Sequence, residues 1–360
     1  MVMVSNEVTP PSAVPEDIYA CPQTGAALHR DSDVLQSKNG SQYPLREQIP
    51  QFLRFGPPDP DGADAKALVR LNQIARERGW LHALKEIYGE KSELYRYVTA
   101  PQRAAFLDLL PLQKETVVLE IGPGLGQFSP IIASRARWLY ALEIDPSQAE
   151  FASTRCAQQN VTNASFACGG DDCRLPYLDG SFDLAIANLV FEWCGARNPD
   201  EPPQNSQKRL LREFARVLKP GGALWLTTKN RFAMRSLFGK LDEHAYQMRF
   251  GNALPRPIMN LMLKLRGKRY PAGVLYTHNG LARMMRDAGL DPARSLWAAP
   301  EMRYPTHFVP VDAASIRAAR KDPTLLQGES RITRLLMPRV PAGLVKRVMP
   351  GLAFIARKRP

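Results

Sequence analysis

The chain has few cysteines and no long apolar run. It contains five cysteines in 360 residues, an odd number, and no two of them are spaced as Cys-x-x-Cys. Reduced thiols in a reducing compartment are the simplest interpretation of that content. No uninterrupted apolar stretch approaches the ~20 residues that a membrane-spanning helix needs, and the first residues lack the basic and apolar regions of a signal peptide. These absences argue against export and predict a cytoplasmic protein.

Acidic residues are scarce in the last third of the chain. Residues 229–360 contain 25 Lys and Arg against 8 Asp and Glu, a net charge of +17. Because the whole chain has a formal charge of +13, the preceding residues carry −4. The 360 residues exceed the usual size of a single core, and a hydrophobic content of 44% is ordinary for a globular protein. The sequence therefore predicts more than one part, with the positive charge concentrated in the last.

A glycine-rich turn follows a strand-like apolar run in residues 117–129. The apolar residues before the turn are typical of a central parallel strand, and Gly122, Gly124 and Gly126 allow close approaches that a Cβ would block. A dinucleotide-binding turn has a glycine at its sixth position, where this chain has Gln127. The spacing predicts a nucleotide-like cofactor against the main chain and argues against NAD and FAD.

The segment Glu120–Gly126 resembles the first motif of class I S-adenosylmethionine-dependent methyltransferases. Glu143 follows, at the end of a second strand-like run and 21 residues after Gly122. That interval is close to the one that brings a carboxylate to the ribose hydroxyls of a bound nucleotide. The resemblance therefore implies that the cofactor is S-adenosyl-L-methionine and that Glu143 accepts hydrogen bonds from its ribose.

Later segments continue the resemblance in the family's order. Residues 170–183 resemble its adenine-binding segment, residues 182–188 its fourth strand, and residues 209–228 a helix that Pro-Gly-Gly ends before a fifth strand. Residues 295–300 are expected as the sixth strand and residues 352–358 as the antiparallel last strand. The resemblance assigns cofactor binding to Glu120, Gly122, Gly124, Gly126, Glu143, Ile144, Asp171, Asp172, Cys173, Asn188 and Leu189.

The implied fold class is α/β, with a Rossmann-like seven-stranded methyltransferase sheet that has helices on both faces. A small β-rich module is expected at residues 1–60, and a linker with a helical cap at residues 61–115. The methyltransferase domain then spans residues 116–360 and contains insertions at about 231–275 and 301–350. Methyltransferases of this type usually bind substrate with such insertions, so substrate choice is expected there.

Aromatic residues in the helical cap allow two interpretations. Tyr88, Tyr95, Arg96 and Tyr97 can close over the methionine end of the cofactor. They can equally be half-buried residues of amphipathic helices, which is the more ordinary role of such side chains.

The amino-terminal module alternates apolar and turn residues, as small β units do. It resembles the zinc-ribbon-like family of methyltransferase activators, whose pattern it matches at Cys21, Pro22, Thr24, Gly25, Leu28, Tyr43, Pro44, Ile49, Pro50 and Leu53. Zinc needs roughly four ligands, and this segment offers Cys21 and His29. No metal site is therefore expected.

The two insertions are basic, interrupted by proline and partly apolar, as in residues 254–266 and 332–340. Such sequence suits an anionic lipid surface or a lipid-linked substrate at the inner membrane face. It also suits an acidic soluble substrate, because arginine matches oxyanions, or nucleic acid, although no recognition motif is evident. A solvated basic surface with no ligand is the fourth interpretation.

A general base is needed only if the acceptor is a hydroxyl. The candidates are His244, His278, His307 and Glu192. His244 is preferred as the catalytic residue because Asp242 and Glu243 lie beside it, whereas His278 stands where a helix is expected to start.

The predicted function is methyl transfer from S-adenosyl-L-methionine to a small-molecule, glycan or lipid-linked acceptor, at oxygen. An RNA methyltransferase is the alternative, since the activator-like module resembles activators of tRNA and translation-factor methylation. Residues 188–191 lack the Asn/Asp-Pro-Pro-Tyr/Phe signature that is usual for methylation of base amines. A scaffold that binds the cofactor without turnover is a third interpretation.

Overall fold

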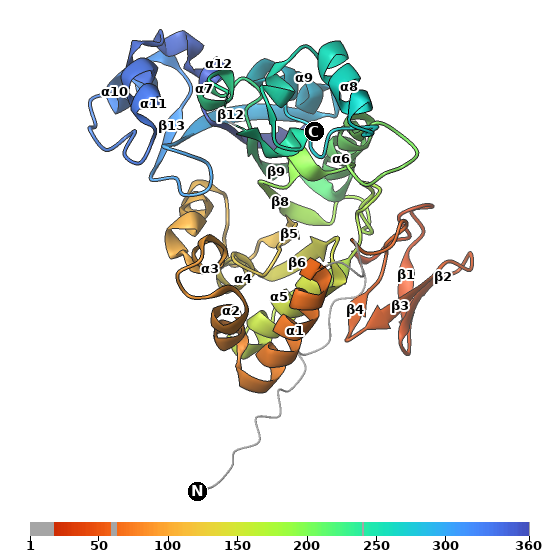
Figure 1. The fold of residues 1–360 in the computed structure, drawn as a ribbon. Helices are drawn as coiled ribbons and strands as arrows, with labels where there is room; N and C mark the ends of the chain where they lie inside the picture. The colour runs from red at the N-terminus through yellow and green to blue at the C-terminus, as the bar shows by residue number, and fades with distance from the viewer. Residues whose placement is uncertain (1–17, 59–62, 240, 360) are drawn as a thin grey trace, which may run out of the picture. The chain divides into compact units, whose positions relative to one another are not determined.

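The computed structural model describes residues 18–58, 63–239 and 241–359. The chain divides into two compact units, each built from several segments (Figure 1). The first unit comprises Met1–Ala100, Leu112–Gly170 and Pro176–Ser181, and the second comprises Pro101–Pro111, Asp171–Leu175 and Phe182–Pro360.

Eight strands form a mixed sheet in the order β13-β12-β14-β9-β8-β5-β6-β7. In the first unit, β5, β6 and β7 are parallel to one another. In the second unit, β8 and β9 are parallel, and β14 pairs antiparallel with both β9 and β12. The strands are β5 (Val117–Ile121), β6 (Trp138–Glu143), β7 (Ala164–Cys168), β8 (Phe182–Asn188), β9 (Leu218–Lys229), β12 (Leu290–Ala299), β13 (His307–Pro310) and β14 (Gly351–Lys358).

The α/β fold class predicted from the sequence is confirmed, with one more strand than expected. The additional strand is β13, which pairs antiparallel with β12 from Leu296 to Ala299 and lies within the predicted insertion at 301–350. β9 begins at Leu218, ahead of the Pro-Gly-Gly turn that was expected to precede it. The central strands are apolar because both faces of the sheet are covered: in β8 and β9 the side chains of Leu184, Ile186 and Leu226 are fully buried.

The amino-terminal module is a four-stranded antiparallel sheet in the order β1-β2-β3-β4. Its strands are β1 (Leu28–Asp31), β2 (Val34–Ser37), β3 (Gln42–Arg46) and β4 (Ile49–Pro50). The module adjoins β7 in the first unit, because the Phe52 amide donates to the Cys168 carbonyl at 2.6 Å. A Cβ on Gly169 would lie 2.8 Å from the Cβ of Phe52, so this junction has room only for glycine. A small sheet is thereby stabilised by a larger core.

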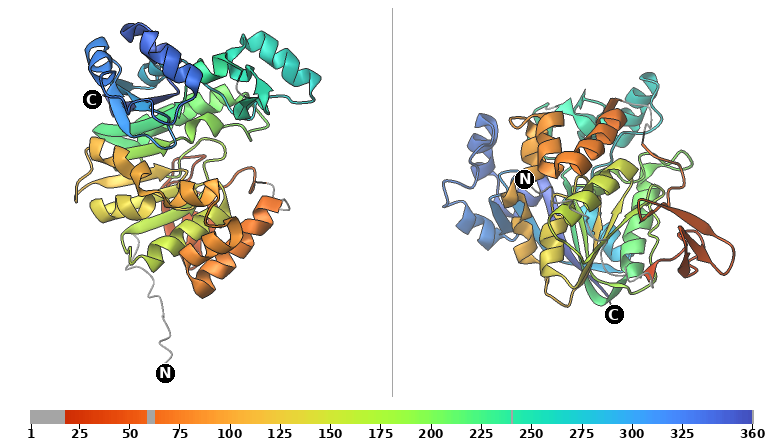
Figure 2. Two further views of the ribbon diagram at one scale, coloured as in Figure 1. Left: turned by 60° about the vertical axis from the view of Figure 1, so that its left-hand side comes forward. Right: turned by 90° about the horizontal axis from the view of Figure 1, so that it is seen from below.

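Helices of the first unit form a second layer. The helices are α1 (Ala63–Arg78), α2 (Trp80–Tyr88), α3 (Glu93–Thr99), α4 (Ser129–Arg135) and α5 (Pro146–Gln158). α1 lies beside α5 (Figure 2), where Asn72 Nδ2 donates to the Ser147 carbonyl at 2.8 Å. Tyr88, Tyr95 and Tyr97 are partly buried against the apolar core of these helices. Their packing is the ordinary role that the sequence allowed.

The second unit contains the remaining helices and short strands. They are η2 (Pro101–Leu109), η3 (Phe191–Trp193), α6 (Pro203–Val217), α7 (Met234–Leu237), β10 (Leu241–Asp242), η4 (Glu243–Ala245), β11 (Met248–Arg249), η5 (Gly251–Ala253), α8 (Arg256–Leu265), α9 (His278–Asp287), α10 (Ala313–Ala319), α11 (Arg331–Leu336), η6 (Met337–Arg339), η7 (Ala342–Leu344) and α12 (Val345–Val348). Both predicted insertions therefore contain helices.

Among the residues described, no helix combines the length and the apolar composition that crossing a membrane requires.

Candidate functional site

The glycine turn after β5 has the backbone that its sequence indicates. Gly122, Gly124 and Gly126 all have positive φ, at 68°, 56° and 67°. A Cβ on Gly126 would lie 3.1 Å from the Cα of Ala152, so this glycine also allows α5 to pack against the turn. The turn therefore leaves main-chain atoms accessible at the carboxyl end of β5, where α/β sheets bind ligands.

Glu143, the last residue of β6, is held by this turn. Its Oε2 accepts a hydrogen bond from the Gly124 amide at 2.9 Å, and its Oε1 accepts from the amides of Ile144 at 2.8 Å and Asp145 at 3.2 Å. Burial raises the pKa of Glu143, while the three amides oppose that increase. A carboxylate has about four acceptor positions, so Glu143 retains capacity for about one ligand hydroxyl.

Glu120 lies one strand away and has a different environment. It is buried, and its Oε2 accepts a hydrogen bond from Ser129 Oγ at 2.7 Å, at the start of α4. Burial and the charge of Glu143 raise its pKa to about 7, although Ser129 and Arg155 act in the opposite direction. Within the first unit, Glu120 thus connects β5 to α4, whereas Glu143 lies at the glycine turn.

The predicted adenine-binding residues begin a segment of the second unit and are also buried. Asp171 and Asp172 are 2% and 3% exposed. Asp172 Oδ1 accepts from the Arg174 amide at 3.0 Å, and the Asp172 carbonyl accepts from Arg209 at 2.7 Å. The neighbouring Cys194 thiol and burial raise the pKa of Cys173 well above its ordinary value. This thiol is therefore protonated near neutral pH and suits an apolar contact better than a nucleophile.

Asn188 and Leu189 end β8 in a constrained conformation. Asn188 Oδ1 accepts from Trp225 Nε1 at 3.1 Å and from Thr227 Oγ1 at 2.9 Å, and the Leu189 amide donates to Thr227 Oγ1 at 2.9 Å. Leu189 has a positive φ of 58°, which is uncommon for a leucine and is retained by these bonds. The end of β8 is therefore held rigidly by the side chains of β9.

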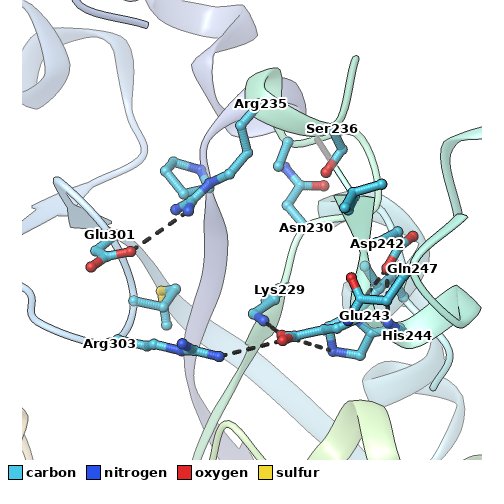
Figure 3. A pocket seen from close by; sticks show the side chains of 15 residues that line it. Lys229, Asn230, Arg235, Ser236, Asp242, Glu243, His244, Gln247, Glu301 and Arg303 are labelled. Carbon is cyan, nitrogen blue, oxygen red and sulfur yellow. Dashed lines mark hydrogen bonds and ion pairs between the residues drawn. The ribbon is translucent and has the colours of Figure 1, made fainter. Parts of the chain in front are cut away.

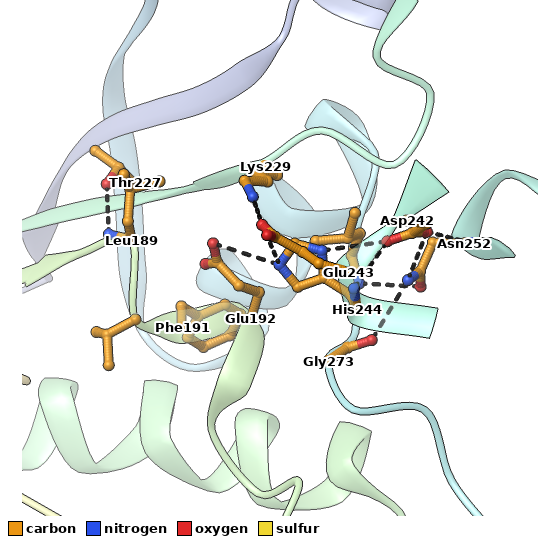
Figure 4. A network of polar contacts seen from close by, with 12 residues as sticks. Leu189, Phe191, Glu192, Thr227, Lys229, Asp242, Glu243, His244, Asn252 and Gly273 are labelled. Atoms are coloured by element: carbon orange, nitrogen blue, oxygen red, sulfur yellow. Dashed lines mark hydrogen bonds and ion pairs between the residues drawn. The ribbon is translucent and has the colours of Figure 1, made fainter. Parts of the chain in front are cut away.

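His244 lies in a buried network in the first insertion (Figure 4). Its Nδ1 is 3.3 Å from Asp242 Oδ1, which also accepts a hydrogen bond from the His244 amide at 3.0 Å. Asp242 Oδ2 accepts from the Asn252 amide at 2.7 Å and from Asn252 Nδ2 at 3.2 Å. Burial would raise the pKa of Asp242, but the bonds from His244 and Asn252 outweigh it and lower that pKa. An ionised Asp242 can accept a hydrogen bond from Nδ1–H, and in that tautomer Nε2 is the acceptor atom of the ring.

The second ring nitrogen of His244 faces two carboxylates. Nε2 is 3.9 Å from Glu192 Oε1 and 4.0 Å from Glu243 Oε1, beyond hydrogen-bond distance of either. In the described part of the chain, neither this Nε2 nor Glu192 Oε2 has a hydrogen-bond partner, although both are buried. The Trp193 ring lies 4.4 Å from the imidazole, centroid to centroid. An unpaired basic nitrogen in this position can accept a proton from a ligand or through a water molecule.

A cavity of about 260 Å³ lies beside this network (Figure 3). His244 and Glu243 line it together with Lys229, which ends β9, and with Arg303. Glu243 forms ion pairs with Lys229 and with Arg303, the latter at 3.5 Å. Met302 and Arg303 also line a small recess with Asn188 and Thr227, so the cavity adjoins the carboxyl end of β8 within the second unit.

The sequence predicted part of this arrangement. It identified His244, its neighbour Asp242 and the distant Glu192, and the structure brings all three together. It missed Asn252, which donates to Asp242. It also missed Gly273, where an added Cβ would lie 2.7 Å from His244 Cδ2. His278 begins α9 as expected, but Thr277 is the residue that caps the helix, by accepting from the Gly280 amide at 3.1 Å. His307 pairs instead with Asp322 at 2.9 Å and does not line the cavity.

The central part of the chain is similar to known proteins. Residues 119–226 match the methyltransferase domain family. This match contains every predicted cofactor-binding residue from Glu120 to Leu189, and it ends before His244. The family match therefore covers the cofactor-binding candidates and Glu192, whereas the residues that line the His244 cavity lie outside it in sequence.

Two curated relatives align with part of the chain. The biotin biosynthesis bifunctional protein BioHC of Cellvibrio japonicus is 37% identical over 145 residues, which are 39% of this chain and 26% of that protein. A malonyl-[acyl-carrier protein] O-methyltransferase of Marinomonas sp. is 32% identical over 154 residues, or 41% of this chain and 53% of that protein. The chain thus spans about half or less of the length of the relatives it matches.

Among solved structures, a phosphoethanolamine N-methyltransferase of Haemonchus contortus, in complex with phosphoethanolamine and S-adenosylhomocysteine, is similar with a TM-score of 0.44. It is 15% identical, and the similarity covers 83% of this chain and 50% of that one. A TM-score of 0.44 is too low to support a functional conclusion.

Proposed function

We propose that this chain is an S-adenosylmethionine-dependent methyltransferase that methylates an oxygen atom of a small-molecule, glycan or lipid-linked acceptor in the cytoplasm. The observation that carries this proposal is the carboxylate of Glu143, which three backbone amides hold at the open glycine turn. The family match over residues 119–226 supports the reaction class. The O-methyltransferase name of the Marinomonas relative supports oxygen as the acceptor atom.

The residues of the glycine turn fit S-adenosyl-L-methionine. Gly122, Gly124 and Gly126 have backbones that exclude side chains from the turn, which leaves space for a ligand against the main chain. Three amides use three of the roughly four acceptor positions of Glu143, so about one remains for a ribose hydroxyl. From the resemblance we also assign the adenine to Asp171, Asp172 and Cys173, an assignment that variants of each residue test separately.

The cavity beside His244 is our candidate for the acceptor. When bound, the cofactor supplies a methyl group activated by its sulfonium. His244 Nε2 would remove the proton of an acceptor hydroxyl, and Asp242 would hold the opposite nitrogen in its protonated form. Lys229 and Arg303 lie in the same cavity and can orient an anionic part of the acceptor.

The activator-like module is proposed to act within the same chain. Its support is the junction of Phe52 with Cys168, the last residue of β7, in the first unit. Residues 18–53 would thus stabilise the edge of the cofactor-binding sheet.

The test of the proposed function is the transfer of labelled methyl groups from S-adenosyl-L-methionine into a host extract. The extract is divided into RNA, protein, lipid and small polar fractions, with the double variant Glu143→Ala, Asp171→Ala as the inactive control. Label in the lipid or small polar fraction, dependent on the intact enzyme, supports the proposal. Label in RNA would instead support an RNA methyltransferase. No label in any fraction would support a scaffold that binds the cofactor without turnover.

A further inference from the structure

Helix α8 has apolar side chains on two faces. Met259 and Leu263 are buried in a cluster with Ala245 and Met248, which attaches the helix to the second unit. On another face, Ile258, Leu261 and Leu265 are 49%, 59% and 79% exposed. Their spacing of three and four residues places them on one stripe of the helix.

Basic residues accompany this stripe without acidic partners. Residues 244–286 contain eight Lys and Arg and no Asp or Glu. Lys264, Arg266, Lys268 and Arg269 are exposed at the end of α8, and no acidic residue in the described part of the chain forms an ion pair with any of them. Positive charge and exposed apolar surface therefore coincide at residues 256–269.

Helix α11, in the second insertion, has the same combination. Ile332 and Leu335 are 49% and 57% exposed, and Arg331 and Arg334 are exposed beside them. Residues 330–360 contain no Asp or Glu. Figure 1 shows α8 and α11 in the upper part of the picture, on either side of β12. The repetition on two separate helices suits a broad anionic surface better than a compact protein epitope.

We propose that residues 256–269 bind the surface of an anionic lipid bilayer, with α11 as a second contact. Ile258, Leu261 and Leu265 would enter the boundary between headgroups and acyl chains, and the four bases would contact lipid phosphates. A free phosphate offers no apolar surface for the stripe, so the apolar side chains distinguish a bilayer from a soluble anion. This inference goes beyond the proposed function, since a membrane contact does not depend on the reaction that the protein catalyses.

The experiment is co-sedimentation of the full chain with two kinds of vesicle. One kind contains phosphatidylcholine alone, and the other contains phosphatidylcholine with phosphatidylglycerol. We expect binding to the second kind only, weakened by salt. Replacement of Lys264, Arg266, Lys268 and Arg269 by Gln should lower the partition coefficient about fivefold for each positive charge removed.

Apolar variants separate insertion from attraction of charge alone. The triple variant Ile258→Ser, Leu261→Ser, Leu265→Ser keeps every charge and should lower the partition coefficient at least about tenfold. The matched control is Val69→Ser with Leu94→Ser, two exposed positions on α1 and α3, which should bind as the unaltered chain does. Circular dichroism and melting temperature confirm that each variant is folded.

If the unaltered chain does not bind anionic vesicles, the proposal is wrong. It is also wrong if the folded triple Ser variant binds as strongly as the unaltered chain, because the apolar stripe would then not contribute to binding. Binding to an acidic carrier protein through residues 256–269, with no binding to vesicles, would assign the surface to a protein instead. Methyl transfer is measured separately, so a failure here leaves the proposed function standing.

Discussion

Replacement of Glu143 by Gln is the sharpest test of the cofactor site. The carboxylate accepts three backbone hydrogen bonds, one at Oε2 and two at Oε1, with lengths of 2.8 to 3.2 Å. The amide of glutamine has one acceptor oxygen, so its NH₂ group must face either the Gly124 amide or those of Ile144 and Asp145. One or two buried donors are left unpaired, and the charge that ribose hydroxyls would meet is lost.

The magnitude follows from the bonds that change. A hydrogen bond to a charged group contributes about 1.5–3 kcal/mol, which corresponds to roughly 10- to 150-fold in affinity for each ribose hydroxyl. The effect on stability is smaller, because loss of the buried charge offsets the loss of backbone bonds: burial already raises the pKa of Glu143. Cofactor affinity should therefore fall at least about tenfold in a chain that remains folded.

Isothermal titration calorimetry with S-adenosylhomocysteine measures this change. The matched control is Glu115→Gln, an exposed glutamate just before β5, which should bind with unchanged affinity. Unchanged affinity in folded Glu143→Gln would refute the assignment of the ribose to Glu143. The double variant Glu143→Ala, Asp171→Ala should abolish binding altogether, and residual tight binding would refute the pocket.

Four further predictions concern other parts of the chain. His244→Gln and Asp242→Asn should each lower kcat for a hydroxyl acceptor by about 10²–10⁴ with KM little changed, and an unchanged kcat would exclude His244 as the base. Glu120 has a folded pKa of about 7 against an ordinary 4.5, so its protonated form favours folding and stability is lost as pH rises from 4.5 to 7. Chemical denaturation measures this as the difference in free energy of unfolding between Glu120→Gln and the unaltered chain. That difference should shift by up to about 3 kcal/mol in favour of the variant as pH rises across that range. A difference that does not change with pH would contradict the raised pKa. Gly126→Ala should lower the free energy of unfolding by about 1–3 kcal/mol, because its φ is positive and its Cβ would meet α5; an equal melting temperature would contradict this. Metal analysis after dialysis should find no zinc, and stoichiometric zinc would overturn the interpretation of Cys21.

The hydrogen bonds around Cys21 could not be predicted from the sequence. The sequence indicated only that too few metal ligands surround it. In the structure, burial would raise the pKa of Cys21, but hydrogen bonds that involve Thr24, Tyr43 and Ser41 outweigh it and lower the pKa to about 7. Those partners lie up to 22 residues away and meet only when the module folds.

The sequence by itself determined the glycine turn, the strand at residues 182–188 and a helix that follows it, although the helix begins at Pro203, earlier than the expected segment from residue 209. These features depend on local chemistry: positive φ needs glycine, and buried strands and amphipathic helices need apolar residues at intervals of two to four. Leu210, Leu211 and Phe214 are buried along one face of α6 for that reason. Glu143 could be proposed as a candidate in the same way, because it ends a strand at a regular distance from the turn.

Only the tertiary structure decided the cavity and its network. His244, Glu192 and Asn252 come from separate segments, and no local pattern specifies that Asn252 should bond to Asp242 or that Glu192 should face an imidazole. The pairing of β13 with the sheet was equally hidden, since an edge strand of four residues carries little periodicity. Long-range contacts of this kind depend on the packing of the whole unit, which compensates the entropy of closing long loops and which a short stretch of sequence does not contain.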